Sequence, residues 1–447
     1  MEGGIGMSKT IKKHRNNSLF IIAVFLMFIG MSPHPVTAQT LFDWGGFAES
    51  SSELQWDGET DYQQDIEAGI WFETRFSENA SLRSEAKYQF NLDRTYFADL
   101  NQFVFTGTHP IETETLTSRI SYRLGRFNFA DFTGYVLDHN LDGGEIEVEL
   151  PWGTLSAGAG YTGLTFVPNS RILVTQSDIG VHLSAPDHGY QTAPPKTIGR
   201  FEVAFPQLLL EQDVHVNFIA QQDLQQDSDL LTPEDRIFTE YFGIGIAGSM
   251  SRDLYHRFYS YLNYGHGTYN TLAYLAGGEF TYYMEDLNYS RLKLAGFYSS
   301  GDPEQGSYYG GYNGSDYSNH FIPLSHSKQF GIVFSPSPGN IGVGELSYSI
   351  KPLSSVYAGE LQLELSALSF IRSSTGAISE PGVGTTSDQQ YLGSEADLRL
   401  NYRPFSDLGI TLSGGVFMPN NYSDDSPFAN SRTEIEAVGR LDISFTY

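Results

Sequence analysis

Long segments in which apolar and charged residues alternate are the feature that most limits how this chain can fold. In residues 65–76, Ile66 and Ile70 fall in one phase, whereas Glu67 and Glu73 fall in the other. A period of two places successive side chains on opposite faces of a β-strand. Strands in soluble sheets average about five or six residues, but these segments approach the roughly 9–11 residues of a membrane-crossing strand. We therefore expect strands that cross a membrane with one apolar and one charged face.

The same alternation recurs along the chain, for example in residues 80–92 and 395–403. Short turn-like segments and long polar segments alternate between the strands, as in barrels with short periplasmic turns and long outer loops. An up-and-down order with both termini on the periplasmic side requires a strand at Tyr96–Thr106. It also requires Gln329–Ser335 to be the outer end of the strand that continues through Gly342–Lys351. The prediction is an all-β fold, a transmembrane antiparallel up-and-down β-barrel of 16–18 strands, with 18 favoured by this count.

The first 38 residues have the pattern of a secretory signal peptide. Basic residues between Lys9 and Arg15 precede the apolar run Leu19–Met31, and the small residues Val36-Thr37-Ala38 follow it. We therefore expect a signal peptide at 1–38, which is removed, and one outer-membrane β-barrel domain at 39–447. The chain has no cysteine, which excludes a lipid-anchored lipoprotein, a disulfide framework and a thiolate metal site.

The charge balance limits the possible partners. Without residues 1–38, which hold four basic residues and one acidic residue, 22 basic and 52 acidic residues remain, a net charge of −30. Such an acidic chain is not expected to bind nucleic acid. Acidic chains can be disordered, but 31 Phe, 28 Tyr and 46 Gly do not fit a disordered composition.

The last segment, Glu434–Tyr447, alternates throughout and ends on an aromatic residue in its apolar phase. It looks like the C-terminal signal that outer-membrane barrels present to their assembly machinery. A last strand must also pair with the first, because unpaired backbone groups are costly in hydrocarbon. The expected location is the bacterial outer membrane, and the expected partners are its lipid, its lipopolysaccharide and the barrel-assembly machinery.

Several short motifs allow the sequence to be compared with a known family. They are Leu124-Gly125-Arg126, Leu141-Asp142-Gly143, Tyr298–Asp302, Leu346–Leu353 and Leu400–Phe405. Together they resemble the alginate-export family of outer-membrane porins, whose members look like barrels of about 18 strands. The resemblance implies diffusion of a solute through a lumen. It does not imply alginate as the solute, because that family conducts a polyanion through an Arg-rich constriction and this chain is strongly acidic.

A barrel of this size leaves a water-filled lumen, which the polar strand faces are expected to line. Charges in such a lumen set selectivity, and a basic wall beside an acidic one is expected to orient dipolar solutes. The alternative is that these side chains are solvated or mutually paired, without a selective role. The candidate pore-lining residues are Arg75, Arg83, Lys87, Arg119, Arg123, Glu145, Glu147, Glu149, Arg291, Lys293, Arg399 and Arg403.

The function that these patterns favour is a porin for passive diffusion of small hydrophilic solutes, such as saccharides or organic acids, with no cofactor and no catalytic step. A closed structural or adhesive barrel is the main alternative. A lipid-modifying enzyme is less favoured, because Ser325-His326-Ser327 has no evident orienting acid. A plugged receptor is disfavoured because the first strand is expected near Phe47. The Gly- and Ser-rich loop Gly306–Ser318 contains Tyr308, Tyr309, Tyr312 and Tyr317. It is expected to be a stacking surface for a sugar, a constriction folded into the pore, or plain outer surface.

Overall fold

The computed structural model describes the chain from Leu41 onward, and the signal peptide predicted at 1–38 lies outside the described residues. The described part is residues 41–447 except 92–96, 113–116, 184–189, 210, 226–236, 268, 315, 354–359, 422–425, 429–431 and 433.

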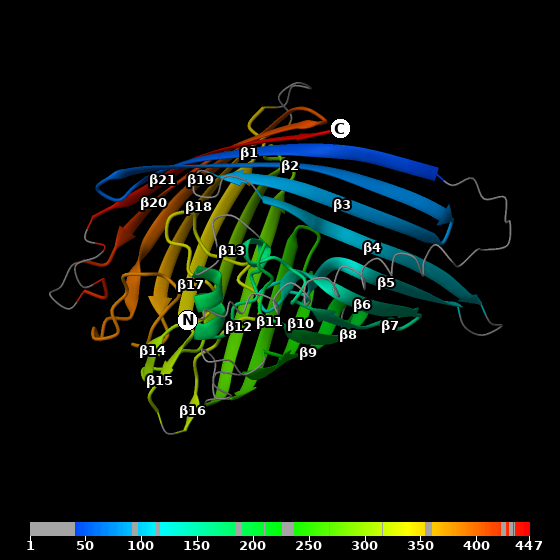
Figure 1. Ribbon diagram of the computed structural model, residues 1–447. Coiled ribbons are helices and arrows are strands. Elements are labelled where there is room, and N and C mark those ends of the chain that lie inside the picture. The colour runs from blue at the N-terminus through cyan, green and yellow to red at the C-terminus, as the bar shows by residue number, and fades with distance from the viewer. Residues whose placement is uncertain are drawn as a thin grey trace, which may run out of the picture. The chain divides into compact units, whose positions relative to one another are not determined.

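Within these residues, eighteen long strands form one antiparallel sheet that closes on itself (Figure 1). The closure pairs the last strand with the first, from Phe47 opposite Thr446 to Trp56 opposite Ala437, so neither terminal strand is left unpaired. The predicted barrel is confirmed, at 18 strands. The first nine barrel strands are β1 (Leu41–Trp56), β2 (Thr60–Ser77), β3 (Ala80–Asn91), β4 (Phe97–Glu112), β5 (Thr117–Ala130), β6 (Asp138–Leu150), β7 (Gly153–Tyr161), β8 (Lys196–Leu209) and β9 (Gln212–Asp223). The other nine are β10 (Phe238–Ser249), β11 (Leu254–His266), β12 (Asn270–Met284), β13 (Ser290–Ser299), β17 (Ile341–Ile350), β18 (Leu361–Arg372), β19 (Tyr391–Phe405), β20 (Leu408–Pro419) and β21 (Glu436–Thr446).

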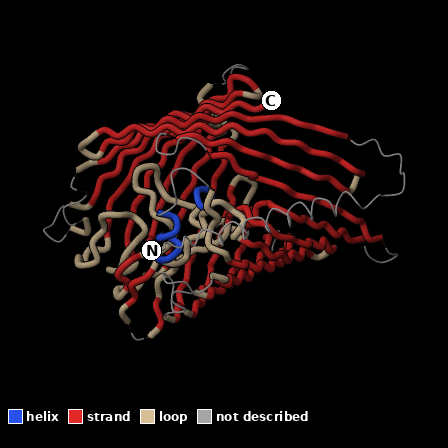
Figure 2. Tube along the Cα trace, viewed as in Figure 1, coloured by secondary structure: helices blue, strands red, loops and turns tan. Residues whose placement is uncertain are grey.

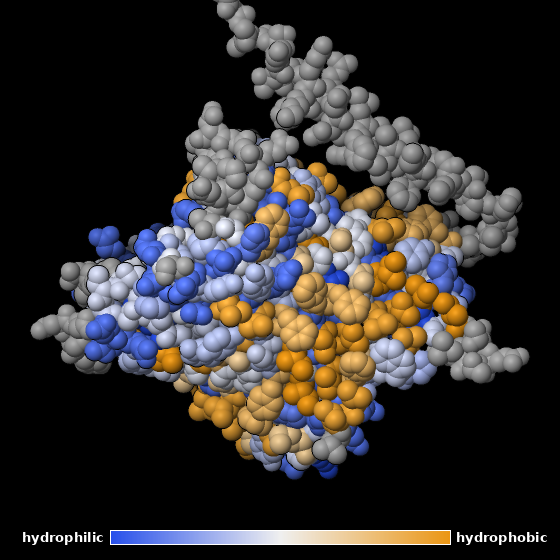
Figure 3. All heavy atoms as spheres, turned by 90° about the horizontal axis from the view of Figure 1, so that it is seen from below, coloured by the Kyte–Doolittle hydropathy of each residue, from blue (hydrophilic) through white to orange (hydrophobic). Residues whose placement is uncertain are grey.

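The outer surface of the barrel is apolar, the reverse of a soluble protein. In β2, Ile66, Ile70 and Phe72 are each about 40% exposed, while Glu67 and Glu73 in the other phase are only partly exposed. Figure 3 shows apolar side chains gathered in a broad band across one face of the barrel. Large exposed apolar side chains on every alternate position suit contact with lipid rather than water.

Smaller elements lie in the connections (Figure 2). The segment between β7 and β8 contains a 3₁₀ helix, η1 (Val167–Asn169), and an α-helix, α2 (Gln176–Leu183). The segment between β13 and β17 contains β14 (Gln305–Ser307), β15 (Gly310–Tyr312) and β16 (Tyr317–Ser318). Among the described residues, no helix combines the length and the apolar character needed to cross a bilayer.

The outer end of the β5–β6 hairpin leaves the wall and turns into the barrel (Figure 1). β5 pairs with β4 only as far as Arg126 opposite Phe103, and β6 pairs with β7 only as far as Asp142 opposite Tyr161. Beyond these points residues 127–130 pair with residues 138–141, and residues 131–137 form the tip of the hairpin. We call residues 126–142 the infolded hairpin.

Glycines mark the place where the hairpin turns inward. Gly125 has a φ of +119°, which L side chains rarely adopt, and a Cβ there would lie 2.0 Å from the carbonyl oxygen of Phe103. On β6, a Cβ at Gly143 would lie 2.0 Å from the carbonyl oxygen of Ala159. Both strands therefore need glycine at the bend.

An apolar core lies inside the barrel, between the infolded hairpin and the wall of β9–β13. Phe127 and Phe129 are fully buried and stack with ring centroids 4.5 Å apart. At the hairpin tip, Phe132 stacks on His215 of β9 and Tyr261 of β11, each at 5.4 Å. The hairpin thus fills one side of the lumen with packed side chains.

Residues 329–335 also pack into this core, which differs from what the sequence predicted for them. The predicted strand at Tyr96–Thr106 is confirmed from Phe97 to Thr106, within β4, and Tyr96 lies outside the described residues. Gln329–Ser335, however, is a loop and not the outer end of β17. Phe334 of this loop is fully buried against Phe417, with rings stacked at 4.6 Å. Its backbone is held by Glu395 of β19, which accepts hydrogen bonds from the amides of residues 332–334 at 2.5, 2.8 and 2.8 Å. The apolar run therefore serves the interior core and not the lipid-facing wall.

Candidate functional site

A polar cavity of about 820 Å³ lies between the infolded hairpin and the strands on the far side of the barrel from its apolar core. We call it the luminal cavity. Strands β1–β4 and β21 line one side of it, and the hairpin with parts of two loops lines the other. Its polar lining includes Glu49, Ser51, Asp65, Glu67, Lys87, Gln89, Asn91, Asp99, Asn101, Arg126, Asn128, Asp138, His139, Asn140, Asn169, Arg171, Ser327, Asp442 and Ser444.

Arg126 fixes the hairpin side of this cavity. Its guanidinium donates two hydrogen bonds to Asp142, at 2.9 and 2.7 Å, a bidentate geometry that is strong and directional. It also donates to the carbonyl oxygens of Leu100 and Leu164, both at 2.9 Å. The side chain is nearly buried and holds together the hairpin, β4 and the segment after β7.

Further side chains satisfy the edge of β4 that the hairpin leaves without a strand partner. Asn140 donates to the backbone carbonyl oxygen of Asn101 at 3.0 Å, and Asn169 donates to the side-chain carboxylate of Asp99 at 2.5 Å. Unpaired strand edges and buried polar groups are costly when they lack partners. Side chains therefore provide partners to this part of β4 while the cavity stays open beside it.

The opposite side of the cavity is acidic. Glu67 accepts hydrogen bonds from Lys87 at 3.3 Å and from Gln89 at 2.6 Å. Glu49 on β1 and Asp442 on β21 have no ion pair within the described part of the chain. The described lining of the whole cavity holds six acidic and three basic side chains, so the cavity carries net negative charge.

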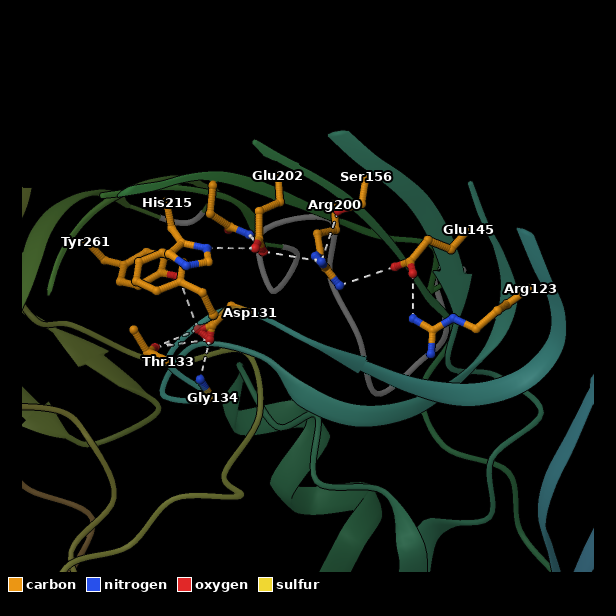
Figure 4. A network of polar contacts seen from close by, with 12 residues as sticks. Arg123, Asp131, Thr133, Gly134, Glu145, Ser156, Arg200, Glu202, His215 and Tyr261 are labelled. Atoms are coloured by element: carbon orange, nitrogen blue, oxygen red, sulfur yellow. Dashed lines mark hydrogen bonds and ion pairs between the residues drawn. The ribbon is translucent and has the colours of Figure 1, made fainter. Parts of the chain in front are cut away.

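A chain of ion pairs runs along the wall from β5 to β9 (Figure 4). Arg123 donates to Glu145 at 2.5 Å, and Arg200 of β8 donates to the other oxygen of Glu145 at 3.2 Å. Arg200 also contacts Glu202 at 3.2 Å, which lies 3.2 Å from the ring nitrogen of His215. In this chain of ion pairs, which we call the ladder, the two arginines alternate with the two glutamates, so the charge of each is offset by its neighbours.

The hairpin tip beside this ladder is held by Asp131 (Figure 4). Its carboxylate accepts hydrogen bonds from the Thr133 hydroxyl at 2.7 Å, the Gly134 amide at 2.8 Å and the Tyr261 hydroxyl at 3.1 Å. Burial raises the pKa of the Asp131 carboxyl, and these hydrogen bonds act against the rise. The arrangement ties the tip to β11.

Most of the candidate residues predicted from sequence form ion pairs with neighbouring carboxylates. The wall is therefore a set of local pairs, in which the basic face of β5, with Arg119 and Arg123, lies directly beside the acidic face of β6. Arg399 and Arg403 have no ion pair within the described residues, and Glu147 lies between two paired glutamates. The pairs are Arg75–Glu73 at 3.0 Å, Arg83–Glu85 at 3.3 Å, Lys87–Glu67 at 3.3 Å, Arg119–Glu149 at 3.1 Å, Arg123–Glu145 at 2.5 Å, Arg291–Glu364 at 3.1 Å and Lys293–Glu345 at 2.6 Å.

The structure brings few of the candidate residues together. Lys87 lines the luminal cavity, and Arg123 and Glu145 belong to the ladder, whereas the others are spread over the barrel wall. Sequence reasoning missed Arg200, although it falls in the same phase as Glu202 and the alternation there identifies a polar face. It also missed Arg126, which entered only as part of a family motif.

Tyr308 of the long outer loop does not contribute to an open sugar-stacking surface, whereas Tyr317 of the same loop is 46% exposed. Tyr308 is 5% exposed and donates a hydrogen bond to the carbonyl oxygen of Pro338 at 3.1 Å. Burial raises the pKa of the Tyr308 hydroxyl well above its ordinary value. Tyr309 packs against Tyr308 at 4.8 Å. Both rings help to fold the loop.

No protein-family model matches the chain, and no curated protein matches it in sequence. Its fold, however, is similar to solved outer-membrane porin structures from Pseudomonas aeruginosa. With OccK3 (OpdO) it shares a TM-score of 0.53 at 12% identity, over 91% of this chain and 96% of that one. With OccK2 (OpdF) the TM-score is also 0.53 at 12% identity, over 91% and 97%. With OccD3 (OpdP) it is 0.51 at 10% identity, over 93% and 95%. The chain therefore has the closed 18-stranded barrel fold of these outer-membrane porins.

Proposed function

We propose that this protein is a porin of the bacterial outer membrane, through which small hydrophilic solutes diffuse passively. The observation that carries the proposal is a polar cavity of about 820 Å³ inside a closed barrel with an apolar exterior. A space of this size and polarity suits hydrated small molecules, and charges beside a pore select among solutes. The proposed solutes are those expected from sequence, saccharides or organic acids.

The path that we propose runs along the wall of β21 and β1–β4, because the apolar core occupies the other side of the lumen. In this proposal the predicted residues Arg75, Arg83 and Lys87 line the path near the cavity. The remaining candidates line the wall elsewhere, where their ion pairs keep the local field small. Their role is then to keep the wall hydrated and rigid. The carboxylates of the cavity that have no ion pair set the selectivity.

Planar-bilayer recording of the purified, refolded protein tests this function. We expect stable single-channel conductance steps in salt solution. A double variant, Asp131→Ala with Tyr261→Phe, loosens the hairpin tip without touching the cavity lining and should add larger or noisier conductance levels. A barrel that is correctly folded by circular dichroism and by electrophoretic mobility, yet never conducts, would overturn the proposal in favour of a closed structural or adhesive barrel.

Three finer assignments belong to the same proposal. Membership of the alginate-export family rests on the short sequence motifs, and alginate is not proposed as the solute. The proposed role is conduction and not catalysis. Assembly through the barrel-assembly machinery, by way of the segment Glu434–Tyr447, and contact with lipopolysaccharide follow from the proposed location. Pull-down of the nascent chain with and without Phe445→Ala and Tyr447→Ala tests the assembly partner.

A further inference from the structure

Residues 325–327, in the connection between β13 and β17, join the infolded hairpin to the segment that follows η1. The Ser325 hydroxyl accepts from the amide of Asp138 at 2.8 Å, and the Ser327 hydroxyl donates to the carbonyl oxygen of Asp138 at 2.5 Å. On the other side, the backbone amide of His326 donates to the carbonyl oxygen of Arg171 at 3.0 Å. We call residues 325–327 the latch, because they hold together two segments that are distant in sequence.

The latch lies at the edge of the luminal cavity. Ser327 lines this cavity, and so do Asp138 and Arg171, the two residues to which the latch is hydrogen-bonded. The bonds of the latch therefore fix the hairpin side of the passage. Their loss would free the hairpin from the segment after η1 and allow the passage to widen.

The imidazole of His326 stands in a site that suits only its neutral form. Its Nε2 atom donates to the carbonyl oxygen of Leu173 at 2.8 Å. Its Nδ1 atom is buried and has no hydrogen-bond partner within the described residues. The ring also contacts the rings of Tyr309 and Tyr308, at centroid distances of 5.4 and 5.9 Å. A second proton would lie on Nδ1 and create a buried cation with an unsatisfied donor, which is costly.

The surroundings of this imidazole offer no counter-ion. In the part of the chain that the structure describes, no acidic side chain forms an ion pair with His326, and the hydrogen bond to Leu173 is the contact that favours its charged form. Burial outweighs this contact and lowers the pKa of His326 to about 4 from 6.5. The titratable and charged groups on the elements around the ring are Asp138 of the hairpin, Arg171, Asp178 of α2, and Tyr308, Tyr309 and Lys328 of the same connection.

We propose that the latch is an acid-sensitive gate, in which protonation of His326 releases residues 325–327 and lets the infolded hairpin move out of the path. This inference rests on the proposed function, since it names the regulation of the same passage. The released form takes up a proton near pH 6.5 and the closed form only near pH 4. The closed form is therefore fully stable above pH 6.5 and loses stability as the pH falls from there towards 4. Between about pH 7.5 and about pH 5 the equilibrium should shift about thirtyfold towards the released form.

Planar-bilayer recording at these two pH values tests the gate, with His326→Gln as the main variant. Glutamine keeps a donor for the carbonyl oxygen of Leu173 but takes up no proton. The unaltered protein should reach larger conductance levels about thirtyfold more often at the lower pH, whereas His326→Gln should keep its neutral-pH behaviour. The matched control His266→Gln, at an exposed histidine on the outer end of β11, should respond as the unaltered protein. An equal response in His326→Gln and the unaltered protein overturns the gate.

A second buried histidine of the same connection needs its own control. His320 is 2% exposed and contacts Tyr308 at 5.1 Å, so its protonation also acts on this loop. The recordings are therefore repeated in the His320→Phe background. The acid response of the conductance should persist there, and it should disappear when His326→Gln is added. Disappearance of the response in His320→Phe alone would overturn the assignment of the gate to His326.

Hydrogen exchange at the Ser325 amide tests the release separately from conduction. This amide donates to the carbonyl oxygen of Val136 at 3.0 Å while the latch is closed. Its protection factor, which corrects for the intrinsic pH dependence of exchange, should fall about thirtyfold between the two pH values and should stay constant in His326→Gln. This result supports the release even if no current is seen. A barrel that conducts equally at both pH values and keeps Ser325 protected overturns this inference and leaves the porin proposal standing. A barrel that never conducts and keeps Ser325 protected overturns both.

Discussion

The hairpin tip offers the sharpest test of how the lumen is shaped, through the substitution Asp131→Ala. The Asp131 carboxylate accepts from the Gly134 amide at 2.8 Å, the Thr133 hydroxyl at 2.7 Å and the Tyr261 hydroxyl at 3.1 Å. The side chain is 6% exposed, so alanine leaves these donors buried without an acceptor. The tip should then dock less firmly against β11.

The size of the effect follows from these contacts. Hydrogen bonds to a charged group contribute about 1.5–3 kcal/mol each, and the burial that raises the pKa of Asp131 offsets part of their sum. A net loss of about 3 kcal/mol in docking free energy is expected, which is roughly a hundredfold change in the docking equilibrium. Native-state hydrogen exchange at the Ser325 amide measures it, because that amide donates to the carbonyl oxygen of Val136 in the tip at 3.0 Å and makes no contact with the substituted side chain.

The conservative variant Asp131→Asn is the control. Its amide oxygen can still accept from Gly134 and Thr133, so the loss should be about 1 kcal/mol and exchange should rise less than tenfold. The amides of β11 should exchange as in the unaltered protein in both variants. Unchanged exchange at Ser325 in Asp131→Ala, or equal acceleration throughout β11, would refute this account of the tip.

Other predictions address the loops, the buried ions and the two faces of the wall. Burial lowers the pKa of His320 to about 4 from 6.5. The opened form of its loop therefore binds more protons between these pH values, and the closed form loses about 3 kcal/mol of stability as the pH falls through this window. Protease sensitivity of residues 319–324 should rise on acidification, and His320→Phe should abolish the rise. Lys196 is fully buried, and its Nζ atom lies 3.0 and 2.7 Å from the carboxylate oxygens of two aspartates. Lys196→Met should lower the free energy of unfolding by about 3–5 kcal/mol and expose α2 to limited proteolysis. Unchanged protection of α2 would contradict a structural role for this lysine. Ile146→Arg places a charge on the lipid-facing phase and should destabilise the barrel by about 2–4 kcal/mol, as measured by urea titration within lipid vesicles. The control Glu147→Arg, on the other face, should be tolerated. Equal losses of stability in the two variants would mean that the two faces have been assigned wrongly.

The sequence alone predicts the wall of the barrel well, because each wall strand repeats one simple rule. Ile66, Ile70 and Phe72 are exposed as a lipid-facing phase requires, and the strand count follows from the alternation and its turns. The alternation does not predict which charged side chains form ion pairs across neighbouring strands. Arg119 stands opposite Glu149, and Arg123 opposite Glu145, only because of the β5–β6 register. Periodicity identifies the face of a side chain and not its partner on the next strand.

The interior was not predictable from the same rule. Residues 329–335 are apolar enough to resemble a wall strand, yet Phe334 is buried in the lumen and Glu395 binds the backbone beside it. A short apolar run is ambiguous between a lipid-facing strand and a packed loop. Only the contact with β19 and β20, which are distant in sequence, decides between them.

One signal of the infolded hairpin is nevertheless present in the sequence, as a reversal of polarity within a single strand phase. Along β6, Ile146 is 55% exposed on the lipid-facing phase, whereas Asp142 and Asn140 in the same phase are polar. The opposite phase reverses as well, from the charged Glu145 to the fully buried Leu141.

A strand that stayed in the wall would place Asp142 and Asn140 toward lipid, where polar groups are costly. The reversal therefore requires the strand to leave the membrane wall between Asp142 and Glu145, at the glycines that allow the bend. β5 carries the matching change, from the exposed Leu124 across Gly125 to Arg126. A phase reversal at paired glycines on adjacent strands should accordingly mark an infolded hairpin in other barrel sequences, and its polar side should mark the lining of the passage.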